Sequence, residues 1–172
     1  MKLKNFYTCC FIGHRQIDLN NNLQMTIYEC VENLILNQNV SKFLFGSKSQ
    51  FNDLCHSVVT RLKQKYPFIK RIHYAINSET TIFENNKELI ESCLLKITNI
   101  KNNLLAFEQR VEYKNILVSG KASYVERNYA MIDNSDYCIF YYDKNNSKNK
   151  SGTEIAYSYA KRKNKKIINL YV

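Results

Sequence analysis

Short apolar runs alternate along this chain with stretches in which apolar residues recur every three to four positions. The first pattern is typical of strands buried on both faces, and the second of helices that pack one face against a core. The apolar runs predict strands at residues 6–12, 40–45, 69–76, 116–119, 137–142 and 166–172. Helical spacing predicts helices at residues 22–38, 51–66, 89–97, 124–132 and 153–163.

Strands that alternate with helices predict a parallel sheet, and right-handed crossovers place the helices on both faces. We therefore expect an α/β fold with a doubly wound, mainly parallel sheet, of the Rossmann-like kind. The 172 residues contain no repeat and no linker, so residues 1–172 are expected to form a single domain.

The apolar segments also indicate in which cellular compartment we expect to find the protein. No segment reaches the ~20 consecutive apolar residues that a membrane-spanning helix needs. The apolar run at 6–12 leads into Gly13, His14 and Arg15 rather than into a cleavage site of small residues. The six cysteines show no paired metal-ligand spacing, which favours reduced, buried thiols. We expect a cytoplasmic protein that does not associate with membranes.

The formal net charge of +10 would attract nucleic acid, acidic lipid or anionic small molecules. The basic residues are spread along the chain, however, and the densest run, at 161–166, closes a predicted helix, where cations complement the helix dipole. Nucleic acid is therefore a possible partner but not the favoured one. The three histidines, at 14, 56 and 73, lack metal-ligand spacing, and no metal or cofactor is expected.

Only four glycines occur, and each lies in a predicted turn after a strand or at the start of a helix. In open α/β sheets, ligands bind at the carboxyl ends of the strands. Glycine lets the backbone approach a ligand there, and the following helix offers free N–H groups to an anion. Although turns use glycine for structural reasons too, the pattern predicts an anion-binding site along this rim.

Polar residues accompany each glycine. The candidate ligand-binding residues are Gly13, His14, Arg15, Gly46, Ser47, Ser49, Asp53, Gly120, Arg127, Asn128, Ser151, Gly152 and Thr153. Arg15 can bind phosphate through two parallel hydrogen bonds, whereas His14 either contacts the ligand or fixes its loop. Serines at a helix start are equally suited to capping the helix. Glu126 and Glu154 are the candidate catalytic carboxylates.

Four ordered motifs carry a resemblance to a known family. They are Cys9 to Arg15 (CCFIGHR), Phe45 to Leu54 (FGSKSQFNDL), Tyr124 to Asp136 (YVERNYAMIDNSD) and Ser151 to Ala160 (SGTEIAYSYA). Together they resemble the bacterial YoqJ/YpsA-like proteins of the SLOG superfamily. This Rossmann-like group also includes the Lonely Guy phosphoribohydrolases and the DNA-processing protein DprA.

The resemblance implies a site for a nucleotide or nucleotide derivative, formed by these loops. Members of the superfamily hydrolyse nucleoside monophosphates, sense ADP-ribose-type signals or bind nucleic acid. The Lonely Guy enzymes carry the motif GGxGTxxE. Here Ser151 replaces a glycine, Glu154 directly follows Thr153, and Ala156 stands where the glutamate of the motif would be.

Three functions follow as hypotheses. The first is a sensor or sequestering module for a phosphorylated, nucleotide-type small molecule, with its phosphate at residues 46–49 and 151–153 and Arg15 or Arg127 as the counter-charge. The second is hydrolysis of an N-glycosidic bond in a nucleoside phosphate by Glu126 and Glu154. The third is nucleic-acid binding. We also expect a homo-oligomer.

Overall fold

The computed structural model describes residues 6–46, 49–76, 94–98, 122–145 and 151–171, and every structural statement below concerns these ranges. The strands are β1 (Tyr7–Gly13), β2 (Val40–Phe45), β3 (Lys70–Ile76), β4 (Leu94–Thr98), β5 (Tyr137–Tyr141) and β6 (Lys166–Asn169). The helices are α1 (Asn21–Gln38), α2 (Gln50–Lys65), α7 (Ala122–Asp133) and α8 (Gly152–Arg162).

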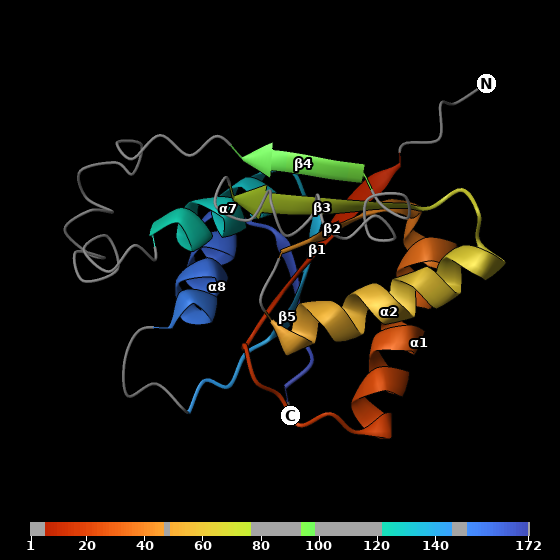
Figure 1. Ribbon diagram of the computed structural model, residues 1–172, viewed down its shortest axis with the longest axis horizontal. Helices are drawn as coiled ribbons and strands as arrows, with labels where there is room; N and C mark the ends of the chain where they lie inside the picture. The colour runs from red at the N-terminus through yellow and green to blue at the C-terminus, as the bar shows by residue number, and fades with distance from the viewer. Residues whose placement is uncertain (1–5, 47–48, 77–93, 99–121, 146–150, 172) are drawn as a thin grey trace.

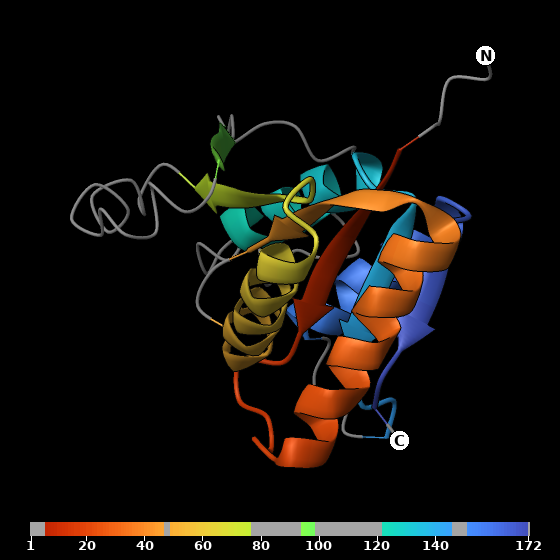
Figure 2. The same cartoon turned by 90° about the vertical axis from the view of Figure 1, so that its right-hand side faces the viewer.

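The strands form one six-stranded sheet in the order β4-β3-β2-β1-β5-β6, and every neighbouring pair is parallel. Helices α1 and α2 cover one face of this sheet, and α7 and α8 cover the other (Figures 1 and 2). The predicted Rossmann-like α/β arrangement, with helices on both faces of a parallel sheet, is therefore confirmed.

Strand β1 shows why the central strands appear in the sequence as unbroken runs of apolar residues. Because successive side chains of a strand point to opposite faces, Cys9 and Phe11 join the core under α1 and α2, whereas Cys10 and Ile12 join the core under α7 and α8. All four side chains are buried. Both faces of β1 are covered, so no polar position interrupts the run.

Polar caps fix where the helices begin and end. The side chain of Asn20 accepts a hydrogen bond from the backbone N–H of Leu23 at the start of α1. Helix α1 ends at Gln38 and is capped by Asn39, which takes the left-handed backbone conformation that asparagine tolerates. The hydroxyl groups of Ser49 and Ser151 cap α2 and α8 in the same way as Asn20 caps α1.

One helix prediction is wrong. Helical spacing predicted a helix at 89–97, but residues 94–97 belong to β4, which pairs with β3 from Ile72 opposite Leu94 to Ile76 opposite Thr98. Residues 89–93 of this prediction lie outside the described residues. Pairing along the edge of β3 supplies backbone hydrogen bonds that a local pattern cannot reveal. The strand predicted at 116–119 lies outside the described residues.

The strand order locates the place where a ligand would bind. From β1 the chain proceeds outwards to β2, β3 and β4, and it returns to β5 and β6 on the opposite side of β1. The order therefore reverses between β1 and β5, whose last residues, Gly13 and Tyr141, are register partners. Open α/β sheets bind ligands in the crevice beyond the carboxyl ends of strands at such a switch point.

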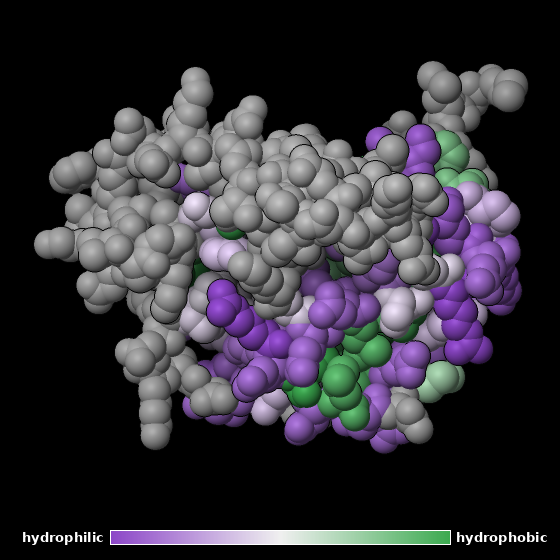
Figure 3. All heavy atoms as spheres, in the orientation of Figure 1, coloured by the Kyte–Doolittle hydropathy of each residue, from purple (hydrophilic) through white to green (hydrophobic). Residues whose placement is uncertain are grey.

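The described surface is mainly polar on the face shown in Figure 3, with a larger group of apolar side chains in the lower centre of the view and a smaller one at its upper right. Within the described ranges, none of the helices combines the length and the apolar character that a membrane span requires.

Candidate functional site

The loop after β1 is fastened to the start of α2. The Ser49 hydroxyl donates to the carbonyl oxygen of His14 at 3.0 Å, and it also accepts from the backbone N–H of Asn52. The backbone N–H of Gln50 donates to the carbonyl oxygen of Arg15 at 2.9 Å. These bonds hold the Gly13–Arg15 turn beside the second glycine turn, and they commit the Ser49 hydroxyl to contacts within the protein.

Gly13 is required by packing. A Cβ atom placed on Gly13 would stand 2.4 Å from the ring of Phe51, which is closer than real Cβ atoms approach their neighbours. Phe51 is fully buried in the first turn of α2 and stacks on Tyr141 at the end of β5. The close approach of helix and turn therefore leaves no space for a side chain at position 13.

Gly46 lies beneath the guanidinium group of Arg127. A Cβ atom on Gly46 would lie 2.9 Å from Cζ of Arg127 and 3.1 Å from each of its two Nη atoms, so the guanidinium plane lies flat over the glycine. Arg127 is buried, and its Nε donates to Oδ1 of Asn128 at 3.2 Å. The absence of a side chain at position 46 thus allows the guanidinium group of Arg127, on α7, to pack against the end of β2.

A buried amide orders the turn at Gly46. The backbone N–H of Gly46 donates to Oδ1 of Asn52 at 2.9 Å, and Asn52 is buried in α2. This N–H group is therefore already bonded within the protein and is not one that a phosphate could use. Sequence reasoning missed Asn52, because three residues after a helix cap it resembles any polar residue of a first turn.

Arg15 and Arg127 meet at Tyr124. Their Cζ atoms lie 5.7 Å and 5.4 Å from the centroid of the Tyr124 ring, within the range of cation–π interactions. Arg15 is exposed, and no described carboxylate pairs with it. Two cations from distant parts of the sequence are thus held beside one aromatic ring. Tyr124 was missed, although its position three residues before Arg127 places both on one helix face.

His14 joins the two strands at the switch point. Its Nε2 accepts a hydrogen bond from the backbone N–H of Asp143 at 3.1 Å, and its ring lies 6.1 Å from that of Tyr142. Burial lowers the pKa of His14, and the nearby Asp143 carboxylate only partly opposes this effect. Because Nε2 accepts, the imidazole is neutral. Of the two roles considered for His14, this geometry provides the one that fixes its loop.

The start of α8 forms the other side of the rim. The hydroxyl of Ser151 accepts from the backbone N–H of Glu154 at 3.1 Å, and Thr153 is buried. A Cβ atom on Gly152 would meet no atom within 4 Å, so the space there is open. Burial first, and then the charge of the Glu154 carboxylate, raises the pKa of Tyr142. Tyr142 follows β5, and its ring lies 5.0 Å from that of Tyr157 on α8.

The remaining candidate site residues are linked less directly to the two glycine turns and the two arginines. Glu126 is partly buried on α7, and this burial raises the pKa of its carboxyl group. Asp53 is exposed on α2, although partial desolvation raises its pKa as well. Ser47 and Gly120 lie outside the described residues. Direct contacts therefore unite Gly13–Arg15, Gly46, Ser49, Arg127 and Asn128, and the start of α8 adjoins them through Tyr142.

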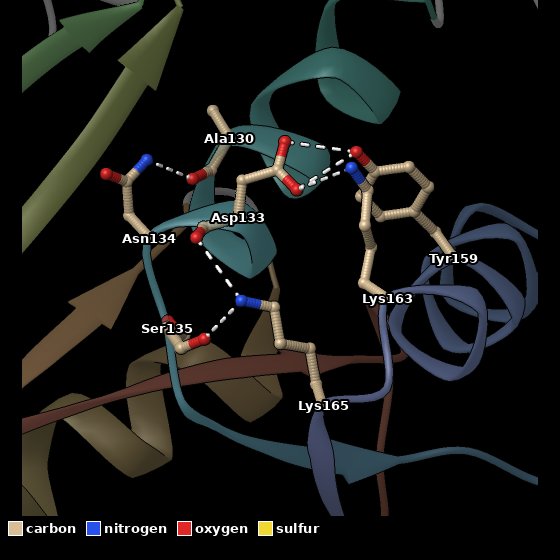
Figure 4. Close-up of polar contacts among 7 residues, drawn as sticks. All are labelled: Ala130, Asp133, Asn134, Ser135, Tyr159, Lys163 and Lys165. Carbon is tan, nitrogen blue, oxygen red and sulfur yellow. Dashed lines mark hydrogen bonds and ion pairs between the residues drawn. The ribbon is translucent and has the colours of Figure 1, made fainter.

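The basic run at 161–166 is largely engaged within the fold (Figure 4). Nζ of Lys165 donates to the carbonyl oxygens of Asp133 and Ser135, at 3.3 Å and 2.7 Å, where it caps the end of α7. The carboxylate of Asp133 also accepts from the Tyr159 hydroxyl and pairs with Lys163 at 3.6 Å. Much of the charge in this run therefore stabilises the corner between α7 and α8.

Acidic, histidine and cysteine side chains are not gathered into a metal site in the described ranges, where no group of three or more could hold an ion. Among the described residues, Arg15 and Arg127 bring positive charge to the rim, and Asp143 and Glu154 bring negative charge. This arrangement suits an organic anion that also carries hydrogen-bond donors.

Comparison with known proteins supports the resemblance that the sequence motifs suggested. No curated protein matches the chain. A family model, that of the YspA SLOG family (YpsA), matches residues 9–172, which include all four glycines and the described strands from Cys9 onwards. The chain belongs to the YspA SLOG family.

Proposed function

We propose that the protein binds a nucleotide or a nucleotide-derived phosphorylated small molecule at the carboxyl ends of β1, β2 and β5, as a sensor or sequestering module. Membership of the SLOG family is consistent with a nucleotide-related, ligand-binding role. The observation that carries the proposal is the pair of guanidinium groups, Arg15 and Arg127, held against Tyr124.

The two arginines differ in a way that suits anion binding. Arg127 is buried and lies fixed over Gly46, so its position is set before a ligand arrives. Arg15 is exposed and pairs with no described carboxylate, so its donors are available to a phosphate. A preorganised cation beside an available one lowers the free energy spent on ordering the site when an anion binds.

Calorimetric titration tests this proposal with nucleoside mono-, di- and triphosphates and with ADP-ribose. We expect binding at micromolar concentrations or below for at least one compound. The variant Arg15→Gln should weaken this binding by about tenfold or more, because a charge-assisted hydrogen bond contributes roughly 1.5–3 kcal/mol.

Arg61→Gln is the matched control for Arg15→Gln. Arg61 is also an exposed arginine above a tyrosine ring, with its Cζ 5.5 Å from the centroid of Tyr28, but it belongs to the interior of α2 rather than to the rim. Its replacement should leave nucleotide binding unchanged. Failure of the whole panel to bind the wild-type protein would contradict the proposed function.

A second candidate function is hydrolysis of an N-glycosidic bond in a nucleoside phosphate. The raised pKa of Glu126 favours it, because a carboxyl group that stays protonated closer to neutral pH is better suited to act as a general acid. Release of free base from nucleoside monophosphates, followed by chromatography, tests this function. Glu126→Gln and Glu154→Gln should each reduce the release, and absence of release by the wild-type protein contradicts the hypothesis.

A further inference from the structure

Strand β6 forms one edge of the sheet, and no strand of the described ranges pairs with its outer side (Figure 2). The backbone N–H groups of Lys166 and Leu170 donate to carbonyl oxygens along β5, at 3.1 Å and 2.8 Å. Backbone N–H and C=O groups point to opposite sides of a strand at successive residues, so every second residue from Lys166 to Leu170 faces β5. The backbone groups of Ile167 and Asn169 therefore point outwards from the sheet.

The outer edge of β6 lacks two features that commonly keep edge strands apart. Proteins protect exposed edges with charged side chains or with proline. Residues 167–171 (IINLY) contain neither. The charge of Lys166 is directed away from the edge, because its Nζ lies 4.7 Å from the ring centroid of Tyr137 on β5 and 5.9 Å from that of Tyr7 on β1. The edge is thus uncharged and able to pair.

Apolar side chains of this edge are incompletely covered on both faces of the sheet. Ile168 and Leu170 pack against the core under α1 and α2, whereas Ile167 packs against the core under α7 and α8. All three are partly exposed, in contrast to the buried side chains of β1. A helix laid on the sheet would cover one face only. A strand added to the edge would bring neighbouring side chains to both faces.

The edge is complementary to a copy of itself. A twofold axis brings two identical edges together in antiparallel orientation. With the axis at Ile168, Ile167 of each copy lies opposite Asn169 of the other, and such a pair of outward-facing residues exchanges both of its N–H···O=C bonds. Lys166 then lies opposite Leu170, so the two identical cations do not face each other.

We propose that β6 is the contact surface for a second copy of this chain, and that the sheets of the two copies join antiparallel through their β6 edges. An identical edge satisfies the outward backbone groups in register and adds no charge to the contact. This property matters because the formal net charge of +10 makes two copies repel each other over the rest of their surfaces. The inference is independent of the proposed function.

Sedimentation equilibrium of the full chain tests the dimer. The wild-type protein should sediment at micromolar concentration with the mass of two chains. Ile167→Pro should sediment with the mass of one, because proline removes an N–H group that faces outwards and none that donates to β5. Ile167→Val keeps this N–H group and is the matched control, which should remain dimeric. A monomeric wild-type protein would overturn the inference, as would a dimeric Ile167→Pro.

Cross-linking tests the register, and it also covers the case in which the proline variant fails to fold. In the proposed register, the Cα atoms of residue 168 in the two copies lie ~4.5 Å apart, a separation that a disulfide can span. The Cα atoms of residue 167 in the two copies are offset along the strands and lie beyond the ~7 Å limit of a disulfide. Oxidised glutathione should therefore link Ile168→Cys into covalent dimers but not Ile167→Cys.

The wild-type protein, oxidised in the same way, measures any linkage through native cysteines, of which those in the described ranges are buried or half-buried. Covalent dimers of Ile168→Cys alone support the inference. A wild-type dimer in which Ile168→Cys stays unlinked, or in which Ile167→Cys links equally well, would place the contact elsewhere and overturn it. A monomeric protein that instead binds a strand of another protein at β6 would also overturn it. None of these outcomes involves a nucleotide, so the proposed function is decided separately.

Discussion

At the scale of single residues, Gly46 shows how a site constrains a position that looks like an ordinary turn. The guanidinium plane of Arg127 occupies the space that a side chain at position 46 would need. A methyl group there must displace either the arginine or the end of β2. The glycine therefore positions a cation, in addition to allowing the backbone to turn.

We predict that Gly46→Ala destabilises the protein by about 1–3 kcal/mol, the range typical of overpacking, and weakens nucleotide binding by moving Arg127. Gly152→Ala is the control for stability, because an added Cβ atom meets no atom there, and its free energy of unfolding should stay within about 0.5 kcal/mol of the wild type. Urea denaturation measures both. Equal stability of the two variants would contradict the packing argument at Gly46.

The residues that sequence analysis found and those it missed differ in a physical way. Gly13, Arg15 and Arg127 were found because turn formation and phosphate chemistry are properties of the residue and its neighbours in sequence. Asn52 was missed because it resembles any polar residue of a first turn, although its partner Gly46 is only six residues away. Asp143 was missed because its partner His14 is 129 residues away along the chain. Asp143, moreover, acts through its backbone N–H, which every residue but proline possesses.

At the scale of elements, the start of α2 serves two purposes. Ser49 caps the helix by accepting from the N–H of Asn52, and it also donates to the carbonyl oxygen of His14 in the loop after β1. Ser151 caps α8 but makes no described bond to another element. The two caps are chemically alike, so their comparison isolates the contribution of the link between loop and helix.

We therefore expect Ser49→Ala to lower the free energy of unfolding more than Ser151→Ala does. Loss of a serine cap costs about 1 kcal/mol in either helix. At Ser49, a further ~1 kcal/mol should follow from the lost hydrogen bond to His14. Chemical denaturation of the two variants gives the difference, and equal losses would argue that the link does not stabilise the loop.

The sequence predicted elements well where the local pattern and the tertiary environment agree. Strands β1, β2, β3 and β5 are covered by helices or flanked by other strands, so their apolar runs were unambiguous. Strand β4 is an edge strand whose apolar residues, at 94, 95 and 97, fit helical spacing as readily as strand spacing. Only its pairing with β3 decides between the two.

At the scale of the whole molecule, all three histidines of the chain have a lowered pKa. Burial and the nearby Arg71 lower the pKa of His56 to about 4. Burial, then His56, Arg71 and Arg127, lowers the pKa of His73 to about 3. The centroids of the His56 and His73 rings lie 5.0 Å apart, and each ring also contacts the ring of Phe45, at 5.1 Å and 5.7 Å.

These shifts give stability a definite dependence on pH. The unfolded chain takes up protons at its histidines near pH 6.5, whereas the folded protein resists protonation until about pH 4 and pH 3. The histidines therefore leave stability intact above pH 7 and reduce it as the pH falls from about 6.5 towards 3. Each group can lower the free energy of unfolding by up to about 1.4 kcal/mol per pH unit in this window.

We predict that the melting temperature falls steeply between pH 6.5 and 4, and that His73→Phe makes this fall shallower. Phenylalanine keeps an aromatic ring beside Phe45, whose centroid lies 5.7 Å from that of His73, but it takes up no proton when the chain unfolds. The comparison is made as a difference in slope, so a uniform loss of stability in the variant does not affect it. If the melting temperatures of variant and wild type fall in parallel with pH, the fold does not hold His73 neutral. The sensitivity to acid would then come from protonation of the carboxylates.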